Sequence, residues 1–120
     1  MEDYDLGFIY SLFGETASKI LLYINTFNES YATEIAGHFL MKQQTVRYHL
    51  EKLEGSGILI SWFAGRTRMY RINPRYVLRN ELVILLEKAM KYLPQEIFSG
   101  YFVKRTRPRT KGKTLRKYED

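Results

Sequence analysis

The feature that most constrains this chain is a change in the spacing of its apolar residues at Ile58. Before that residue they recur every three or four positions, as they do in helices that bury one face. From Ile58 to Phe63, and again from Met69 to Ile72, short runs of β-branched and aromatic residues favour two strands. The loop Ala64–Arg68 between them contains a glycine, so the sequence predicts a β-hairpin enclosed between helices.

The helical segments follow from the same spacing and from their end signals. The predicted ranges are 6–13, 15–27, a short helix with Thr33 as its N-cap, 43–54, and a long helix at about 78–93. Glycines end the first and fourth helices, and Pro94 ends the last. The predicted inward stripe of the last helix is Leu78, Leu82, Leu85, Leu86, Ala89 and Leu93.

The order of these elements predicts the fold. Three helices followed by a hairpin form a winged helix-turn-helix, in which the hairpin is called the wing. We therefore expect an α+β fold that is mostly α, with a two-stranded wing and a long C-terminal helix. The predicted winged domain covers 1–98 and carries dimerisation helices at both ends, whereas 99–120 has no apolar periodicity and is predicted to be a disordered basic tail.

Positive charge is gathered in two segments. Residues 42–79 hold eight bases and two acids, a net +6, and residues 101–120 hold the same numbers, whereas residues 1–41 hold one base and six acids. Gathered charge of this kind is expected of a protein that binds a polyanion. A solvated basic surface would explain either segment taken alone, so the interpretation depends on the local structure.

Three stretches together resemble a known family. They are Thr33–Ala36, Thr45–Ile58 and Gly65–Pro74, and through them the chain resembles the ArsR-type winged helix-turn-helix regulators over about residues 12–93. The resemblance implies a homodimeric transcription factor, often a repressor, that pairs through its first and last helices. The position of the turn that this family often fills with glycine is occupied here by Leu40.

The helix at 43–54 is the expected recognition helix. With Val46 facing inward, Gln44 and Tyr48 fall on the opposite side and Arg47 lies beside them. Glutamine and arginine are the side chains that bind adenine and guanine with paired hydrogen bonds, so Gln44 and Arg47 are predicted to select sequence. The full predicted DNA-contacting set of this helix is Lys42, Gln43, Gln44, Thr45, Arg47, Tyr48 and Lys52. An exposed polar helix face without a partner is the alternative.

Two further groups of basic residues are assigned to DNA. Arg66, Thr67 and Arg68 at the hairpin are predicted to reach phosphates or the neighbouring minor groove, unless the hairpin end is only solvated. Arg71 and Arg75 would serve the DNA backbone or pair with Glu54 or Glu81. The predicted phosphate contacts of the tail are Lys104, Arg105, Arg107, Arg109, Lys111 and Lys113. A tail that only keeps the protein soluble is the alternative.

The first and last helices expose more apolar surface than a monomer of this size is expected to leave in water. The predicted dimer interface is Phe8, Ile9, Leu12, Phe13, Val83, Leu86 and Met90. If these two helices instead close the core on each other, no dimer is required. Symmetric pairing would place two recognition helices about one DNA turn apart, ~34 Å.

The sequence does not predict metal sensing, catalysis or membrane insertion. The chain has no cysteine and no histidine in 78–93, so neither type of metal-sensing site that the resemblance suggests is expected, and no cofactor is predicted. His49 is interpreted as a packed histidine and His38 as an exposed one. No catalytic constellation is present, so the protein is not expected to be an enzyme. No membrane span is predicted.

The predicted function is sequence-specific binding of double-stranded DNA by a regulator in a prokaryotic cytoplasm, associated with the nucleoid when bound. Two alternatives remain: a winged module whose partner is a protein or RNA, with the tail supplying non-specific nucleic-acid affinity, and an accessory subunit of an enzyme. No small-molecule effector, operator or direction of regulation follows from the sequence.

Overall fold

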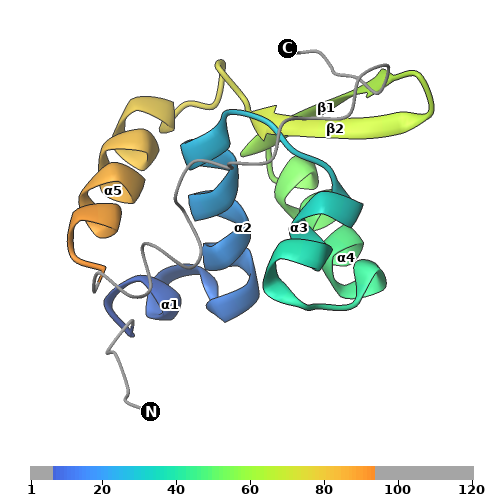
Figure 1. Cartoon of the computed structure of the whole chain (residues 1–120). Helices are drawn as coiled ribbons and strands as arrows, with labels where there is room; N and C mark the ends of the chain where they lie inside the picture. Colours follow the sequence, from blue (N-terminus) through green and yellow to red (C-terminus); the bar gives the residue numbers. More distant parts are fainter. Residues whose placement is uncertain (1–6, 94–120) are drawn as a thin grey trace.

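Seven elements follow one another in the computed structural model, which describes residues 7–93 (Figure 1). They are α1 (Gly7–Phe13), α2 (Glu15–Phe27), α3 (Ala32–Phe39), α4 (Gln43–Gly55), β1 (Leu59–Ala64), β2 (Thr67–Ile72) and α5 (Arg79–Lys91). This is the winged helix arrangement predicted from the sequence, mostly helical with one two-stranded antiparallel sheet. The predicted boundary at residue 98 and the predicted tail lie outside the described residues.

Helix α2 is the centre of the fold and contacts α1, α4, α5 and β2. In Figure 1 it lies between α5 on one side and the α3–α4 pair on the other. Its buried residues are Ala17, Ser18, Ile20, Leu21, Leu22, Tyr23 and Ile24. The hydroxyl of Ser18 donates a 3.2 Å hydrogen bond to the carbonyl of Ile9, which satisfies a buried polar group and fixes α1 against α2.

The hairpin is tighter than the sequence predicts. Ala64 pairs with Thr67, so only Gly65 and Arg66 form the turn, and Gly65 takes the positive φ of 64° that such a turn needs. Thr67 and Arg68 therefore belong to β2, not to the predicted loop. The middle of β2 is also attached to the loop before α3, because the backbones of Ser30 and Tyr70 exchange hydrogen bonds of 3.1 and 2.8 Å.

The start of α3 differs from the prediction. Tyr31, in an extended conformation, is the N-cap, and Thr33 lies inside the first turn. The helix begins early because Ser30 is already fixed to Tyr70, and the chain turns directly from that bridge into α3. The hydroxyl of Ser30 also donates a 2.6 Å hydrogen bond to the Glu34 carboxylate.

Two residues of the predicted inward stripe of α5 are exposed. Leu78 precedes the helix as its N-cap and is 51% exposed, and Leu85 is 36% exposed. The helix meets the core through a narrower stripe, consisting of Leu82, Leu86, Ala89 and, just after the helix, Leu93. Leu85 lies about 100° around the axis from Leu86, which is enough to turn it to the surface. None of the helices in residues 7–93 is long and apolar enough to cross a membrane.

Candidate nucleic-acid interface

The turn between α3 and α4 sets how the candidate recognition helix leaves the core. Leu40 has φ 58° and ψ 49°, the left-handed conformation that glycine adopts most readily, and its side chain is 91% exposed. The N–H of Met41 donates a 2.8 Å hydrogen bond to the carbonyl of Ala36, which closes the end of α3. The chain therefore makes the tight turn of the motif with a leucine in the position of the usual glycine.

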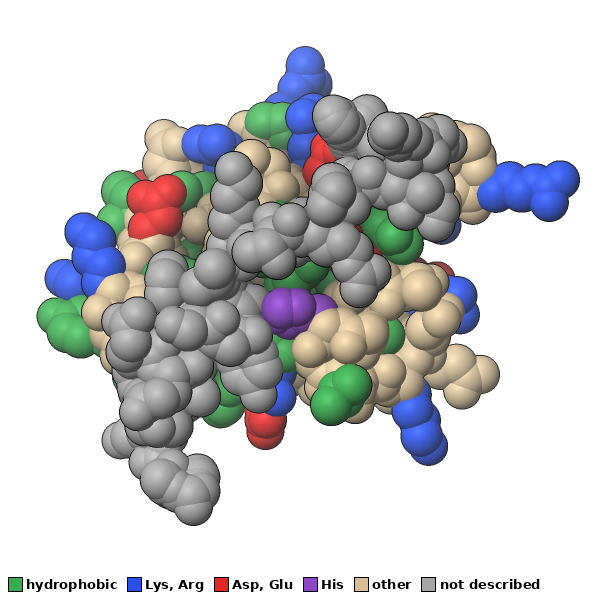
Figure 2. All heavy atoms as spheres, in the orientation of Figure 1, with side chains coloured by type: hydrophobic (Ala, Val, Ile, Leu, Met, Phe, Trp, Pro, Cys, Tyr) green, Lys and Arg blue, Asp and Glu red, His purple; other side chains and the backbone are tan. Residues whose placement is uncertain are grey.

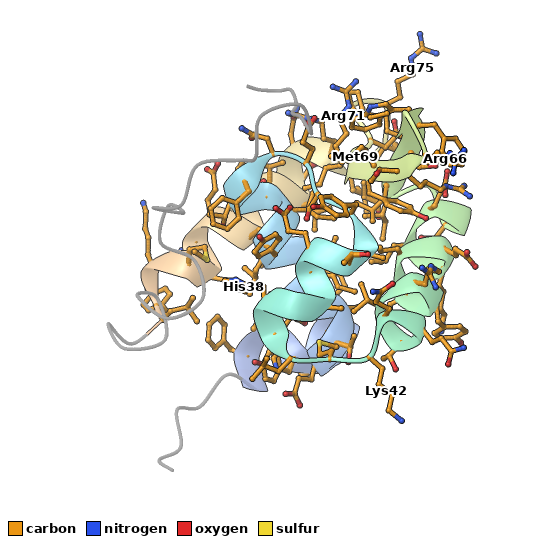
Figure 3. The ribbon with its side chains drawn as sticks, turned by 45° about the vertical axis from the view of Figure 1, so that its right-hand side comes forward. His38, Lys42, Arg66, Met69, Arg71 and Arg75 are labelled. Atoms are coloured by element: carbon orange, nitrogen blue, oxygen red, sulfur yellow. The ribbon has the colours of Figure 1, made fainter. Side chains whose placement is uncertain are left out.

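Helix α4 has one buried and one exposed side, as predicted. Val46 and Leu50 are fully buried and Leu53 nearly so. Every residue of the predicted contact set is exposed: Lys42, Gln43, Gln44, Thr45, Arg47, Tyr48 and Lys52. Lys42 is the N-cap, and its side chain projects away from the molecule at the start of the helix (Figure 3). The polar side of α4 is thus continuous from its first residue to its last turn.

Two contacts organise this exposed side. Nη2 of Arg47 donates a 3.1 Å hydrogen bond to Oε1 of Gln43, one turn earlier. Nζ of Lys52 lies 5.8 Å from the centroid of the Tyr48 ring, which is one turn before it. Gln43, which the sequence gives no separate role, therefore orients the arginine that is predicted to select a base.

The wing adds basic residues next to this helix. Arg66 is exposed in the turn of the hairpin, and Thr67 is half-buried beside it. The Phe63 ring, one residue before the end of β1, is 66% exposed. In the space-filling view, Lys and Arg side chains project at the right-hand edge, where the hairpin tip and α4 lie (Figures 1 and 2).

Arg68 is engaged within the protein. Its Nη2 lies 2.9 Å from Oε1 of Glu54, and its Nε donates a 3.0 Å hydrogen bond to the hydroxyl of Ser61. The Ser61 hydroxyl in turn donates to Oε2 of Glu54 at 2.7 Å. The sequence suggested Arg71 or Arg75 as partners of Glu54 and missed both Arg68 and Ser61. The missing signal is the strand register, which places Phe63 opposite Arg68 and Ser61 diagonally beside it.

Arg71 and Arg75 lie apart from this network. The guanidinium of Arg71 is 5.5 Å from the Trp62 ring, on the opposite face of the hairpin from Ser61 and Arg68. Arg75 is exposed in the loop before α5, where its backbone N–H donates a 2.9 Å hydrogen bond to Oδ1 of Asn73. Figure 3 shows Arg75 pointing away from the molecule and Arg66 at the other end of the hairpin.

Tyr70 forms the buried base of the wing. Burial raises the pKa of its phenol above the ordinary value, against a smaller opposing effect from Arg68. The phenol therefore stays protonated and neutral around pH 7. Because the guanidinium of Arg68 lies 5.7 Å from a neutral Tyr70 ring, the charge that balances it comes from Glu54.

The two histidines are not among the residues predicted to contact DNA. His38 was predicted to be exposed, but it is half-buried, with its ring 4.8 Å from the rings of both Tyr23 and Phe39. His49 is half-buried and packs edge-on against Tyr48 at 5.1 Å. Across residues 7–93, no three histidine, aspartate or glutamate side chains gather in a way that could hold a metal ion.

The predicted dimer residues fall into three groups. Ile9 and Leu86 are fully buried in the core of the single chain, so they cannot line an interface, and their inclusion was wrong. Phe13, Val83 and Met90 are half-buried, with Phe13 and Met90 packed against the core. Phe8 and Leu12 are exposed by 46% and 57%. Ile9 and Leu86 belong to the core because α1 and α5 both pack on the central helix, α2.

The apolar residues that α5 leaves exposed are different ones. Ile84 is 64%, Leu85 36% and Tyr92 67% exposed. Tyr92, the C-cap of α5, meets Phe8 of α1 edge-on, with ring centroids 6.4 Å apart, so exposed apolar side chains of the two segments meet at this pair. Hydrophobic side chains are visible at the left-hand edge of the molecule, where α5 lies (Figures 1 and 2). We call Phe8, Leu12, Ile84, Leu85 and Tyr92 the α1–α5 patch.

Residues 14–61 match the model of a family described as bacterial regulatory protein, arsR family. The match begins just before α2 and ends within β1, so it contains the whole helix-turn-helix. The resemblance to ArsR-type regulators is thereby confirmed over these residues, and such a domain implies DNA-binding transcription regulation. The family is a class of regulators, not of enzymes. No curated protein matches the chain in sequence.

Solved structures share the fold. The YusO protein from Bacillus subtilis is 16% identical, with a TM-score of 0.52 over 72% of this chain and 67% of that one. A mutant of ZitR from Lactococcus lactis is 21% identical, with a TM-score of 0.51 over 72% of this chain and 60% of its own. A second ZitR mutant, in the apo form, is 17% identical, with a TM-score of 0.50 over 78% of each chain. At these identities the likeness is one of fold.

Proposed function

We propose that this chain uses its arsR-type domain as a homodimeric regulator that binds specific sequences in double-stranded DNA and represses transcription. The observation that carries the proposal is the exposed polar side of α4, which begins at Lys42 and includes Gln44 and Arg47. This side lies opposite the buried Val46 and Leu50, so the helix can enter a groove without disturbing the core.

The roles of the α4 residues follow from their chemistry and position. Gln44 and Arg47 lie in the first half of the helix, which is the part that approaches base edges in the major groove. The hydrogen bond from Arg47 to Gln43 limits the freedom of the arginine before DNA arrives. Lys42, Thr45 and Lys52 are assigned to phosphates, and Tyr48 to a phosphate or a thymine methyl group.

The wing supplies a second contact. Arg66 is at the tip of the hairpin and is exposed, so it reaches furthest from the core on that side. Its guanidinium suits phosphates or the negative channel of the minor groove next to the site. Thr67 adjoins it and adds a hydroxyl for a phosphate oxygen.

The α1–α5 patch is the proposed dimer interface. It consists of large exposed apolar side chains of α1 and of α5 with its C-cap, joined by the contact of Phe8 with Tyr92, and exposed apolar surface of this kind marks association sites. A two-fold axis through the patch would bring two copies of α4 to successive turns of one face of the duplex, ~34 Å apart. The dimer then binds a site with two-fold symmetry and represses by occupying a promoter, in the cytoplasm and on the nucleoid when bound.

The test is a selection from random duplex DNA with the full chain, followed by gel shift of the selected duplex at two salt concentrations. We expect a pseudo-palindrome whose half-sites lie about one turn, roughly 10 base pairs, apart. Transcription in vitro from a promoter that contains the selected site should fall as the protein is added. Random duplex is the control, and it should bind more weakly and with a steep salt dependence.

The opposite result would be binding that is equally strong on every duplex. The sequence-specific proposal would then be wrong, and the domain would have to be tested as a module for protein or RNA. Transcription that rises on addition of the protein would keep the DNA site but reject the repressor role.

A further inference from the structure

Three side chains from separate elements meet partway along the wing. Glu54 comes from the last turn of α4, Ser61 from the middle of β1 and Arg68 from β2. Their contacts form a closed triangle: Arg68 to Glu54 at 2.9 Å, Arg68 to Ser61 at 3.0 Å, and Ser61 to Glu54 at 2.7 Å. The two carboxylate oxygens of Glu54 are thus divided between the two strands of the hairpin.

The arginine of this triangle is also packed between rings. Its guanidinium lies 5.8 Å from the centroid of Phe63 and 5.7 Å from that of Tyr70, which are its neighbours on the same face of the hairpin. The Glu54 and Arg68 side chains are 29% and 44% exposed, so the pair is partly shielded from water. A partly shielded pair with additional hydrogen bonds holds its geometry better than an isolated surface pair.

Towards its tip the hairpin has little support on this side. Beyond Phe63 and Arg68 come only Ala64, Thr67 and the two-residue turn, and Ala64, Gly65 and Arg66 are all exposed. Nearer the open end of the hairpin, Tyr70, which pairs with Ser61, is bridged to Ser30, and this bridge fixes β2 to the loop before α3. The triangle is therefore the last attachment of the wing to the helices before its tip.

We propose that Glu54, Ser61 and Arg68 are positioning residues that set the direction of the wing relative to the recognition helix. Arg68 is not a phosphate contact, because its charge is balanced by Glu54 and its hydrogen bonds are directed at Glu54 and Ser61. The phosphate or minor-groove contact at this end of the site falls to Arg66. The spacing between α4 and Arg66, and with it the selection of sequence, depends on the triangle.

This inference rests on the proposed DNA function for its second readout only. The first readout is amide hydrogen exchange of the free, full-length protein. Glu54→Gln and Arg68→Gln should each raise the exchange rates of hairpin amides at 61–69 by on the order of threefold to tenfold, while α2 amides keep their rates. Arg71→Gln is the matched control, because it removes the same charge from the opposite face of the same hairpin and should leave those rates unchanged.

The second readout is binding to the selected and the random duplex over a range of salt concentrations. Glu54→Gln and Arg68→Gln should each lower the ratio of selected to random affinity by on the order of threefold to tenfold, with the salt slope unchanged. The protein that carries both substitutions should have a ratio no lower than either single variant. The exchanged pair, Glu54→Arg with Arg68→Glu, should recover part of the ratio. A merely destabilised fold would not be rescued in this way.

Two results would overturn the proposal. One is hairpin exchange that does not change in either variant, which would mean that the triangle does not hold the wing. The other is an Arg68→Gln protein that binds both duplexes equally more weakly with a salt slope reduced by about one, which is the behaviour of a phosphate contact. If the wild-type protein does not distinguish the duplexes, the proposed function fails, and hydrogen exchange alone decides on the triangle.

Discussion

Leu40 lies where α3 turns into α4, with a φ of 58° that its side chain disfavours. The left-handed conformation costs an L-residue roughly 1–2 kcal/mol because Cβ crowds the following carbonyl. Burial of the side chain does not offset this cost, since the side chain is 91% exposed. The turn of the motif is therefore imposed on this residue by the packing of the helices on either side.

Replacing Leu40 with glycine should therefore stabilise the protein. The relief of backbone strain is partly offset by the larger freedom of glycine in the unfolded chain, so we expect a gain of about 0.5–1 kcal/mol in the free energy of unfolding. Urea denaturation measures it. The matched variant is Gly37→Ala, inside α3, where an added Cβ meets no atom within 4 Å. It should stabilise by about the same amount through helix propensity, and a loss of stability in Leu40→Gly would contradict the strain argument.

Arg47 is the residue on which sequence selection depends most in the proposed function. Arg47→Ala should cost roughly 1–3 kcal/mol in binding to the selected duplex and relax the preference at one base position. Lys52→Ala is the comparison, because a phosphate contact should weaken selected and random duplexes alike and lower the salt slope by about one. Gel shifts on both duplexes separate the two behaviours. Equal weakening of both duplexes by Arg47→Ala would remove its assignment to a base.

At the scale of elements, α5 has two apolar sides with different uses. Leu82, Leu86 and Ala89 bury one side against the core, and Ile84 and Leu85 are exposed to water. A helix that only completed a monomer would need the first side alone. The second side is what the proposed dimer buries.

Ile84→Glu tests this use of α5. It places a charge in the α1–α5 patch, at a position that is 64% exposed in the single chain, so the fold should be retained while the dimer dissociates. Light scattering after size exclusion at tens of micromolar should give a dimer for the wild type and a monomer for the variant. Leu40→Gly, remote from the patch in sequence and fold, should remain dimeric. A wild-type monomer under these conditions would reject the dimer.

The same helix shows what periodicity can and cannot predict. The existence of α5 and the burial of Leu82 and Leu86 follow from spacing, as does the burial of Val46 in α4. The choice of Leu86 for the interface was wrong because an apolar residue at helical spacing does not say which partner its side faces. Leu85 was assigned inward for the same reason.

The sequence predicts that a hairpin is present, but it does not predict the length of the turn or the pairing of the strands. Alternating apolar residues identify the two strands, and a glycine identifies the loop, yet the number of residues in the turn depends on how the strands pair. Once Ala64 pairs with Thr67, Arg68 falls within β2 and comes to face Glu54 from another element. Long-range contacts of this kind leave no local pattern, so the meeting of Arg68 with Glu54 and Ser61 was not found from the sequence.

At the scale of the whole molecule, positive charge is concentrated in the segment that contains α4 and the wing. Residues 42–79, which contain α4 and the wing, carry a net +6, whereas the described residues before them, 7–41, hold one base and three acids. A duplex is therefore attracted more strongly to α4 and the wing than to the N-terminal helices. This asymmetry orients the protein before any base is contacted, and it adds to the rate of association.

The second basic segment, residues 101–120, lies outside the described residues, and we propose that it contacts phosphates without selecting sequence. Removing it deletes eight bases and two acids. A protein that ends at residue 100 should bind both duplexes more weakly, with a salt slope lower by roughly 0.9 for each phosphate that the tail no longer neutralises, and should keep its ratio of selected to random affinity. The control retains the length of the chain and changes Lys104, Arg105, Arg107, Arg109, Lys111 and Lys113 to glutamine. Because that control removes charge and no residues, it should reproduce the lower slope of the deletion, and an unchanged slope in both proteins would exclude the tail from binding DNA.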